Sequence, residues 1–409
     1  QHGFEITDSE EDAEVIVINT CCFIHDAKEE SIQNILEMAK YRTAGSCKVL
    51  LVTGCMAERY RDEIIEEIPE VDAVLGTNSY DKILDAIQDV LGGDRFQEYA
   101  DLKGLPKIDA QRVVTTGGHY EYLKIAEGCD KHCTYCIIPY ARGRVRSRKM
   151  EEVLEEITNL TKHGCQEFVI TGIHVTSYGK DLGDVTLIDL LEEIAKIPEV
   201  KRIRLGSLEP GFITKDTLDR LSKMESFCPH FHLSLQSGCD SVLKRMNRKY
   251  TTQDIREKCK AIREHFQYPA LTTDIIVGFP GETEEEFEET RKFLEEIDLY
   301  EMHVFKYSIR KGTKAADMKP QINDQIKAKR SNVLLEMSKQ HQKEFETKQL
   351  GMVKEVLIEE KMHGKDHYYT GHTKEYIKVA LYSEEPLENK IVKVKLRQIL
   401  DDGYVLAEC

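Results

Sequence analysis

The sequence of 409 residues lacks the features of a membrane or secreted protein. It has no run of eighteen apolar residues and no signal-peptide pattern, and these are the signals of a transmembrane helix or of export. We therefore expect a soluble, cytoplasmic monomer with no membrane partner. Disulfides are rare in the cytosol, so the 12 cysteines predict thiolates that serve another purpose.

Basic side chains are fewer than acidic ones, and the formal net charge is −16. Residues 1–100 hold 22 acidic and 8 basic side chains, whereas residues 101–345 hold 39 of each. The acidity of the first hundred residues argues against an RNA-binding surface there. It leaves the rest of the chain open to an RNA partner.

Strand-like runs and helical periodicities alternate along the first hundred residues. The apolar runs are AEVIVINT, KVLLVTG and AVLG, each followed by helical sequence. This alternation predicts a doubly wound α/β domain with a parallel sheet over residues 1–94. Cys21 and Cys55 directly follow two of the strands, at the carboxyl ends where such sheets bind ligands. Cys22 and Cys47 lie nearby in less suitable positions.

Residues 95–118 have weak periodicity and predict a linker. Over residues 119–345, six strand candidates are each followed by helical sequence: EYLKIAE, EFVITGI, KRIRLGS, HFHLSLQ, LTTDIIVG and EMHVFKYS. A closed barrel of this kind needs eight units, so six predict an open, partial (β/α)6 barrel whose active face lies at the carboxyl ends of the strands.

A long polar helix ending near Gly351 is expected to close this barrel. The residues after it change period, and short β-type runs such as KEVLIEE, TKEYIKVAL, KIVKVKL and YVLAE follow one another. Residues 346–409 therefore predict a small five-stranded β-barrel of the oligonucleotide-binding (OB) type.

Three cysteines lie close together in CDKHCTYC, directly after the first barrel strand. Cys129, Cys133 and Cys136 offer three thiolate ligands, whereas a structural zinc site needs four. Thiolates select zinc or iron–sulfur clusters, and the missing fourth ligand favours a cluster with one open iron. An open metal position is what a catalytic site retains.

The C-x₃-C-x₂-C motif resembles that of radical S-adenosylmethionine (SAM) enzymes. The resemblance implies a [4Fe–4S] cluster whose fourth iron binds SAM and passes it an electron, which yields a 5′-deoxyadenosyl radical. It also implies an electron donor such as flavodoxin or ferredoxin. NTCCFI, VTGCMAERY, GRVRSR, LQSG, NRKYTT and TDIIVGFPGET extend the resemblance to the methylthiotransferases. Residues 346–409 then correspond to the TRAM domain of that family.

The resemblance to methylthiotransferases implies a second [4Fe–4S] cluster, held by three cysteines of the N-terminal domain. Cys21 and Cys55 match the second and third of them. The first lies on an earlier strand of the family, upstream of Gln1, so we expect these 409 residues to cleave SAM without transferring a methylthio group. Substitution by Cys22 or Cys47 is less favoured, because ligand geometry tolerates shifts poorly.

Polar residues follow several of the predicted barrel strands, where function normally resides in such folds. By the resemblance they line the SAM site, and Tyr135 covers the adenine through its backbone. Helix capping is an alternative role for the serines. The residues implied are Tyr135, Thr171, Gly172, Ser207, Glu209, Gln236, Asp274 and Gly278. The sequence identifies no catalytic side chain.

His230 and His232 lie two residues apart on one face of a predicted strand, a spacing that is compatible with a metal site. The sequence shows no third ligand near them. We therefore expect buried, hydrogen-bonded histidines instead.

Two groups of cations are candidates for RNA contact. Arg144 and Arg146 follow the cysteine motif and could clamp phosphates or stack on bases, although such a charge run is as often a solvated face. In the terminal barrel, Lys374, Tyr376 and Lys378 combine cations with a ring, which suits single-stranded nucleic acid. A strand with two different faces would show part of this pattern as well.

Two branches of the methylthiotransferases resemble different parts of the chain. Residues 1 to about 138 resemble the branch that modifies an aspartate of a small-subunit ribosomal protein (RimO type). From about residue 139, VITGIHVTSYGKDLG, CPHFHLSLQSG, MHVFKYSIRKGT and GHTKEYIKV resemble the branch that modifies threonylcarbamoyladenosine in tRNA (MtaB type).

The barrel mouth and the terminal barrel are the parts that select the substrate. We therefore predict 2-methylthiolation of N6-threonylcarbamoyladenosine beside the tRNA anticodon, with the ribosomal-protein aspartate as the alternative. A non-catalytic RNA-binding protein with a structural cluster is a weaker alternative, because the open cysteine spacing argues against it.

Overall fold

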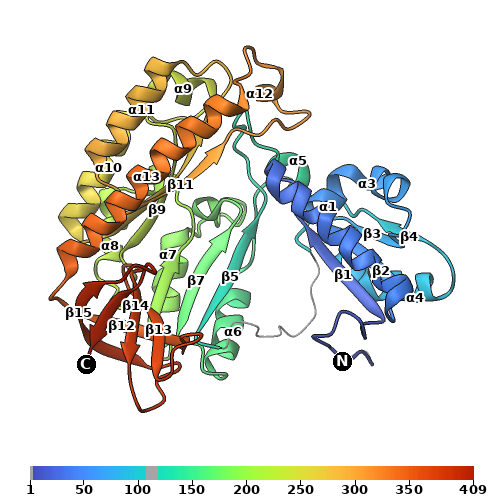
Figure 1. Ribbon diagram of the computed structural model, residues 1–409, viewed down its shortest axis with the longest axis horizontal. Coiled ribbons are helices and arrows are strands. Elements are labelled where there is room, and N and C mark those ends of the chain that lie inside the picture. Colours follow the sequence, from blue (N-terminus) through green and yellow to red (C-terminus); the bar gives the residue numbers. More distant parts are fainter. Residues whose placement is uncertain (1–2, 107–117) are drawn as a thin grey trace. The chain divides into compact units, whose positions relative to one another are not determined.

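The computed structural model describes residues 3–106 and 118–409. They form two compact units, and each is described by itself. The first holds the described residues of Gln1–Arg112 together with Glu127–Arg146 and Ser308–Ala316. The second holds those of Val113–Ala126, Ser147–Tyr307 and Asp317–Cys409. Figure 1 labels the elements in chain order.

A four-stranded parallel sheet, in the order β1-β2-β3-β4, forms the centre of the first unit. Its strands are β1 Val15–Thr20, β2 Val49–Gly54, β3 Ala73–Leu75 and β4 Phe96–Glu98. All of β2 is buried, as expected for a parallel strand covered on both faces. The other elements of this unit are α1 His25–Ala39, α2 Tyr41–Ala44, α3 Cys55–Glu67, η1 Tyr80–Lys82, α4 Ile83–Leu91 and α5 Ile138–Arg142. The predicted doubly wound fold is confirmed.

Strand β4 lies inside the segment that the sequence assigns to a linker. Phe96 to Glu98 pair in parallel with Ala73 to Leu75, so the sheet extends past residue 94. A three-residue strand carries too little periodicity to be recognised, because one apolar side chain cannot define an alternation. Residues 107–117 of the expected linker lie outside the described residues.

Six strands form the half barrel of the second unit, as the sequence predicts. They are β5 Tyr120–Glu127, β7 Glu167–Gly172, β8 Arg202–Leu205, β9 His230–Gln236, β10 Ala270–Val277 and β11 Glu301–Lys306. They belong to two sheets, ordered β6-β5-β7-β8 and β11-β10-β9, with the short strand β6 Arg146–Ser147 at one edge. Two parallel bridges, Ile203 to Phe227 and Leu208 to Leu233, connect β8 to the β9 side.

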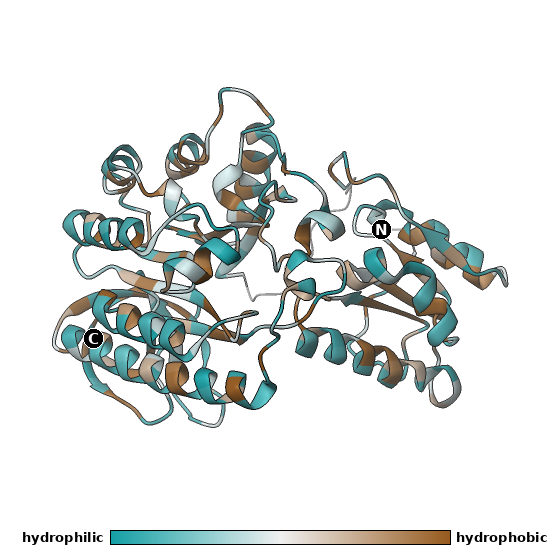
Figure 2. Ribbon diagram, turned by 90° about the horizontal axis from the view of Figure 1, so that it is seen from above, coloured by the Kyte–Doolittle hydropathy of each residue, from teal (hydrophilic) through white to brown (hydrophobic). Residues whose placement is uncertain are grey.

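Helices follow the barrel strands, and a recurrent local signal starts four of them. Thr186, Thr214, Thr251 and Thr283 are N-caps of complete capping boxes, which satisfy backbone donors that a helix start leaves open. Hydrophobic and hydrophilic residues mix along the helices (Figure 2), as amphipathic helices on a sheet require. The helices are α6 Met150–Thr161, α7 Leu187–Ala195, α8 Lys215–Leu221, α9 Asp240–Arg245, α10 Thr252–His265, α11 Glu284–Ile297 and α13 Asp324–Gln349, with the 3-10 turns η2 Val175–Ser177 and η3 Pro210–Phe212. The short helix α12 Lys314–Asp317 lies mostly in the first unit.

The chain ends in a closed five-stranded barrel, ordered β12-β13-β14-β16-β15. This confirms the expected OB-like fold. Its strands are β12 Val353–Lys361, β13 Tyr368–Thr373, β14 Lys378–Tyr382, β15 Ile391–Ile399 and β16 Val405–Glu408. The run TKEYIKVAL is not one strand, because the chain reverses between β13 and β14 and Tyr376 has a φ of 71°.

Two buried arginines connect the half barrel to this terminal barrel. Arg202 donates to the carbonyls of His372 and Glu355, both at 2.7 Å. Arg204 donates to the carbonyls of Lys374 and Thr373 at 2.9 and 3.2 Å.

Glu167, on the neighbouring strand β7, is the shared counter-ion of both guanidinium groups. Its carboxylate lies 2.7 Å from Arg204 Nε and 3.4 Å from Arg202 Nη1. Although burial opposes ionisation, the two arginines lower the pKa of Glu167. The three side chains form a charged group with one negative and two positive members.

Replacing Glu167 with glutamine is expected to lower the free energy of unfolding by about 3–5 kcal/mol, because two buried guanidinium groups lose their counter-ion. Urea denaturation followed by circular dichroism measures the effect. The matched control is Glu193→Gln, which removes an exposed pair with Lys196 and should change stability by no more than about 1 kcal/mol. If the two substitutions lowered the free energy of unfolding equally, the buried charged group would not stabilise the packing of the terminal barrel on the half barrel.

Candidate functional site

The loop with Cys129, Cys133 and Cys136 leaves the end of β5 through a glycine. Gly128 has a φ of 72°, and a Cβ there would lie 1.8 Å from the carbonyl oxygen of Arg144. Only glycine fits this close approach. The amide of Cys129 then donates to Gly143 O, and that of Cys136 to Cys133 O, both at 3.0 Å. Backbone bonds therefore fold the three-cysteine segment back on itself.

The donor groups of this loop fit an iron–sulfur cluster. Three thiols come from one short segment, and the amide of Lys131 points at Cys129 Sγ from 3.4 Å, a type of hydrogen bond that tunes cluster potentials. Burial raises the pKa of the Cys136 thiol to about 12. Iron binding must therefore displace its proton, since the thiolate is the ligand form.

The second pair of cysteines lies at one edge of the N-terminal sheet. Thr20 and Gly54 are paired residues at the carboxyl ends of β1 and β2, and Cys21 and Cys55 come directly after them. Gly54 has a φ of 98°, and a Cβ on it would lie 2.4 Å from Thr20 O, so glycine permits the two strand ends to approach. The structure therefore brings together the two cysteines that the sequence assigns to a second cluster.

The alternative ligands Cys22 and Cys47 occupy different places. Cys22 lies at the same edge, is buried, and its Sγ contacts Cys55 O at 3.3 Å. Cys47 precedes β2, whose six residues separate it from Cys55 by about 20 Å at the usual strand rise. Of these two thiols, only Cys22 lies beside the Cys21 and Cys55 pair.

Two arginines of the first unit contact the cysteine segments. Arg142 donates from Nε to Cys55 Sγ at 3.1 Å and lies 3.5 Å from the buried Glu127 carboxylate. Arg310 donates to the carbonyl of Tyr135, between Cys133 and Cys136, at 2.6 Å and also to the carbonyl of Phe23. An N–H donor to Cys55 Sγ is the type of hydrogen bond that tunes cluster thiolates. Arg310 holds the two cysteine segments of this unit together.

These arginines were not identified as site residues from the sequence. Arg142 lies in a charge run that also fits a solvated face, and Arg310 lies in SIRKGT, far along the chain from both cysteine segments. Neither position shows its partner without tertiary structure.

The residues assigned to the SAM site lie mostly at strand ends. Thr171 and Gly172 end β7, Ser207 follows β8, Gln236 ends β9 and Gly278 follows β10. Gln236 has a φ of 74° although it is not glycine, and such strain is typical of functional positions. These placements agree with a ligand site at the barrel mouth, and the SAM-binding role stays a prediction.

Two of the assigned residues have other partners. Glu209 lies 2.5 Å from Arg248 Nη2, which also donates to Ser234 O. Asp274 lies within β10, three residues before its end, opposite His303 of β11. Tyr135, the remaining assigned residue, belongs to the first unit, is buried, and offers its carbonyl to Arg310.

The predicted RNA-binding residues divide into exposed and internal ones. Arg144 and Lys378 are exposed. Arg146 is buried and donates to the carbonyls of Leu102, Gly104 and Arg142. Its guanidinium is used within the protein, because an arginine can satisfy several carbonyls at once.

Lys374 and Tyr376 also make contacts within the protein. Lys374 donates to Glu225 O at 2.6 Å. The ring of Tyr376 is stacked on His372 and His230, at centroid distances of 4.5 and 5.2 Å. These two side chains therefore pack at the base of the half barrel. RNA binding by the five residues stays a prediction.

Three thiols on a loop after the first strand of a six-stranded half barrel define the radical SAM class of enzymes. The model of the Radical SAM superfamily matches residues 123–294, and that of Uncharacterized protein family UPF0004 matches residues 1–76. A structure of the radical SAM methyltransferase TsrM from Kitasatospora setae, with cobalamin and a [4Fe–4S] cluster bound, has the same fold. The TM-score is 0.56 at 14% identity, over 75% of this chain and 66% of that one.

Related proteins of known description assign the chain to a narrower family within this superfamily. The ribosomal protein uS12 methylthiotransferase RimO of Lachnoclostridium phytofermentans is 44% identical over 361 residues, which are 88% of this chain and 82% of that one. The protein of the same description from Clostridium botulinum (strain Langeland) is 40% identical over 407 residues, 97% and 90% of the two chains. The chain belongs to the radical SAM methylthiotransferase family. It is a transferase that uses SAM and [4Fe–4S] clusters, including the second cluster of that family.

Membrane insertion through a helix finds no support in the described part of the chain. Within residues 3–106 and 118–409, every helix is too short or too polar to cross a bilayer.

Proposed function

We propose that this enzyme transfers a methylthio group to an aspartate of ribosomal protein uS12. The observation that carries the proposal is the extent of the similarity to relatives described as uS12 methylthiotransferases, which spans 82% and 90% of their lengths. This evidence favours the alternative substrate of the sequence analysis over tRNA. Flavodoxin or ferredoxin is the proposed electron donor.

The chain's own residues have distinct tasks in this proposal. When bound, the cluster at Cys129, Cys133 and Cys136 supplies the electron that cleaves SAM. The strand-end residues of the half barrel hold the cosubstrate, and Gly278, with a φ of 69°, leaves room for the side chain of Lys327 beside the end of β10. Cys21 and Cys55 hold the sulfur-presenting cluster, and Arg142 donates a hydrogen bond to Cys55 Sγ.

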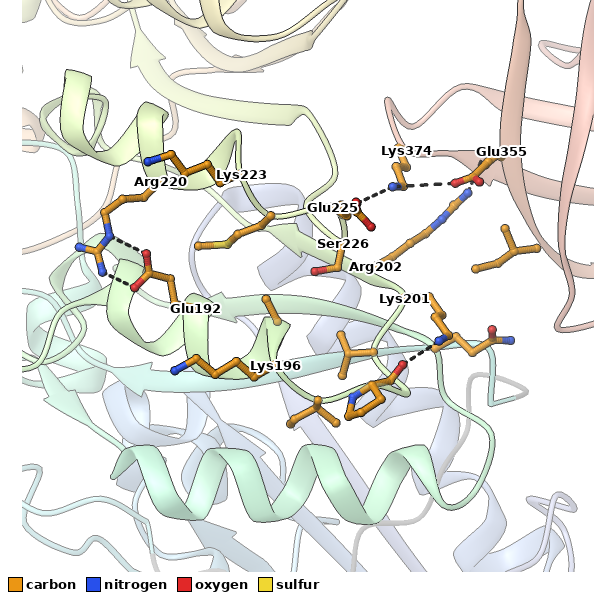
Figure 3. Close-up of a pocket in the computed structure, with 17 residues that line it drawn as sticks. Glu192, Lys196, Lys201, Arg202, Arg220, Lys223, Glu225, Ser226, Glu355 and Lys374 are labelled. Atoms are coloured by element: carbon orange, nitrogen blue, oxygen red, sulfur yellow. Dashed lines mark hydrogen bonds and ion pairs between the residues drawn. The ribbon is translucent and has the colours of Figure 1, made fainter.

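A tRNA substrate is the second candidate, and a surface of the second unit favours it. A cavity of about 990 Å³ lies between the α7 and α8 side of the half barrel and the terminal barrel. Figure 3 shows the lysines and arginines around it. Its charged lining residues are Glu192, Lys196, Lys201, Arg202, Arg220, Lys223, Glu225, Glu355 and Lys374. Arg202 is paired with Glu167 and Arg220 with Glu192, so the lysines are the cations that suit a phosphate backbone.

Parallel product assays separate the two substrates. Reduced full-length enzyme and SAM are incubated with uS12 and with tRNA from cells that lack the gene, and mass spectrometry follows each substrate. We expect a methylthio group in place of one hydrogen on an aspartate of uS12 and unchanged tRNA nucleosides. A 2-methylthio derivative of threonylcarbamoyladenosine, with unmodified uS12, would overturn the proposal in favour of tRNA.

A charge-reversal variant tests the cationic cavity separately. The variant is Lys196→Glu/Lys201→Glu/Lys223→Glu. If the enzyme binds tRNA through this cavity, the slope of log affinity against log salt concentration should fall by about one unit for each lost phosphate contact. Modification of uS12 should be unaffected by these three substitutions. The exposed pair Lys339 and Lys343 of α13, changed in the same way, is the matched control.

A further inference from the structure

Three side chains inside the half barrel form a compact group that no sequence motif reveals. His232 lies on β9, Asp274 on β10 and His303 on β11. One ligand atom from each lies within 4.8 Å of the other two. We propose that His232, Asp274 and His303 form a binding site for a divalent transition-metal ion of the Zn²⁺ or Fe²⁺ type.

Sheet pairing produces this group. Asp274 and His303 are paired residues of β10 and β11, and His232 is paired with Thr272, two residues before Asp274. Side chains two apart on a strand point to the same face. Three neighbouring parallel strands therefore present two imidazoles and one carboxylate to one spot on the inner face.

The separations within the group fit a metal better than they fit direct ion pairs. Asp274 Oδ2 lies 3.3 Å from His232 Nε2, and Asp274 Oδ1 lies 3.5 Å from His303 Nδ1. A charge-assisted hydrogen bond is shorter, at about 2.7–2.9 Å. Ligands with bonds of about 2.0–2.2 Å to a tetrahedral ion lie about 3.3–3.5 Å apart. Each histidine faces its own oxygen of Asp274, so a small ion at the centre would be bound by both oxygens or after a rotation of this carboxylate.

A hydroxyl behind His232 orients its ring. Thr272 Oγ1 lies 2.9 Å from His232 Nδ1 and 3.1 Å from His230 Nε2. When Nδ1 donates to this hydroxyl, Nε2 carries the lone pair that a metal needs, and metal-binding histidines are commonly held in this way. His230 is accordingly hydrogen-bonded, as the sequence predicts, and is not one of the three ligands.

Asp274 supplies the carboxylate of the group, between the imidazoles of His232 and His303. The other charged groups around this space are Glu301, 3.9 Å from His303 Nε2, and the Glu167, Arg204, Glu359 group at the base of the barrel.

Room for further ligands lies next to the three side chains. They line a cavity of about 280 Å³ together with Tyr122, Ser207 and Tyr376. Two histidines and one carboxylate leave coordination positions open, as in catalytic zinc sites and non-haem Fe²⁺ sites. The site would accept water or another oxygen donor in those positions. This inference does not depend on which substrate the enzyme modifies.

Zinc is the probe of choice, because iron in the clusters obscures added Fe²⁺. The full chain with reconstituted clusters is dialysed against Zn²⁺, and zinc, iron and sulfide are quantified. We expect one zinc per chain in addition to the iron and sulfide of the clusters. X-ray absorption at the zinc edge should show nitrogen and oxygen neighbours at about 2.0 Å and no sulfur at about 2.3 Å.

Variants test the assignment of the ligands. His303→Ala and His232→Ala should each weaken zinc binding by about 100-fold or more, and Thr272→Val by about 10-fold to 100-fold. His363→Ala, an exposed histidine of the terminal barrel, is the matched control and should bind zinc as the parent does. Unchanged circular dichroism and cluster iron verify folding of each variant. Zinc bound through sulfur, or equally well by His303→Ala and the parent, would overturn the proposal.

Discussion

Replacing Cys129, Cys133 and Cys136 together with alanine is expected to abolish SAM cleavage completely. The three thiols belong to one loop that Gly128 and the Cys129 to Gly143 backbone bond fold into place. Without thiolates the loop offers no soft ligand to iron, so the cluster and the electron it supplies are lost together. Anaerobic purification and chromatography of 5′-deoxyadenosine give the measurement.

Cys409→Ala is the matched control for this loss. Cys409 is an exposed thiol at the end of the terminal barrel, and its removal should leave iron content and SAM cleavage unchanged. The loop contains no regular strand or helix between Cys129 and Cys136, so the triple variant should retain the parent's circular dichroism. SAM cleavage that persists in the triple variant would contradict the assignment of the cluster.

Local patterns were sufficient to predict most of the architecture. Six barrel strands and the long helix α13 were recognised because each repeats a period over many residues. Cys21 and Cys55 were recognised because each directly follows an apolar strand. The short strand β4 and the reversal at Tyr376 were missed, since a few residues do not define a period.

Features built from distant residues were not predictable. His232, Asp274 and His303 lie on different strands, and only the register of β9, β10 and β11 brings them together. The same limit applies to the cations. Arg146 and Lys374 belong to basic segments of the sequence, yet both bind backbone carbonyls. A count of charges does not show whether a side chain points outward.

Replacing Cys21 and Cys55 together with alanine is expected to remove the second cluster and leave SAM cleavage intact. These two cysteines follow paired residues of neighbouring strands, whereas the SAM-binding cluster uses the separate loop after β5. The iron and sulfide content per chain should fall below that of the unsubstituted protein by the amount that the second cluster contributes. Formation of 5′-deoxyadenosine should be unchanged, because radical formation does not use these two thiols.

Single substitutions at the neighbouring cysteines make this prediction specific. Cys47→Ala should retain the second cluster, because Cys47 lies a full strand length away from Cys55. Cys22→Ala distinguishes a buried core thiol from a ligand, since Cys22 lies at the same edge and burial raises its pKa to about 12. We expect this variant to keep its iron, because the Cys22 thiol donates to the carbonyl of Cys55, whereas Cys55 Sγ receives a hydrogen bond from Arg142. Loss of the second cluster in Cys22→Ala would make Cys22 a ligand, and an unchanged cluster in the Cys21/Cys55 double variant would contradict the site.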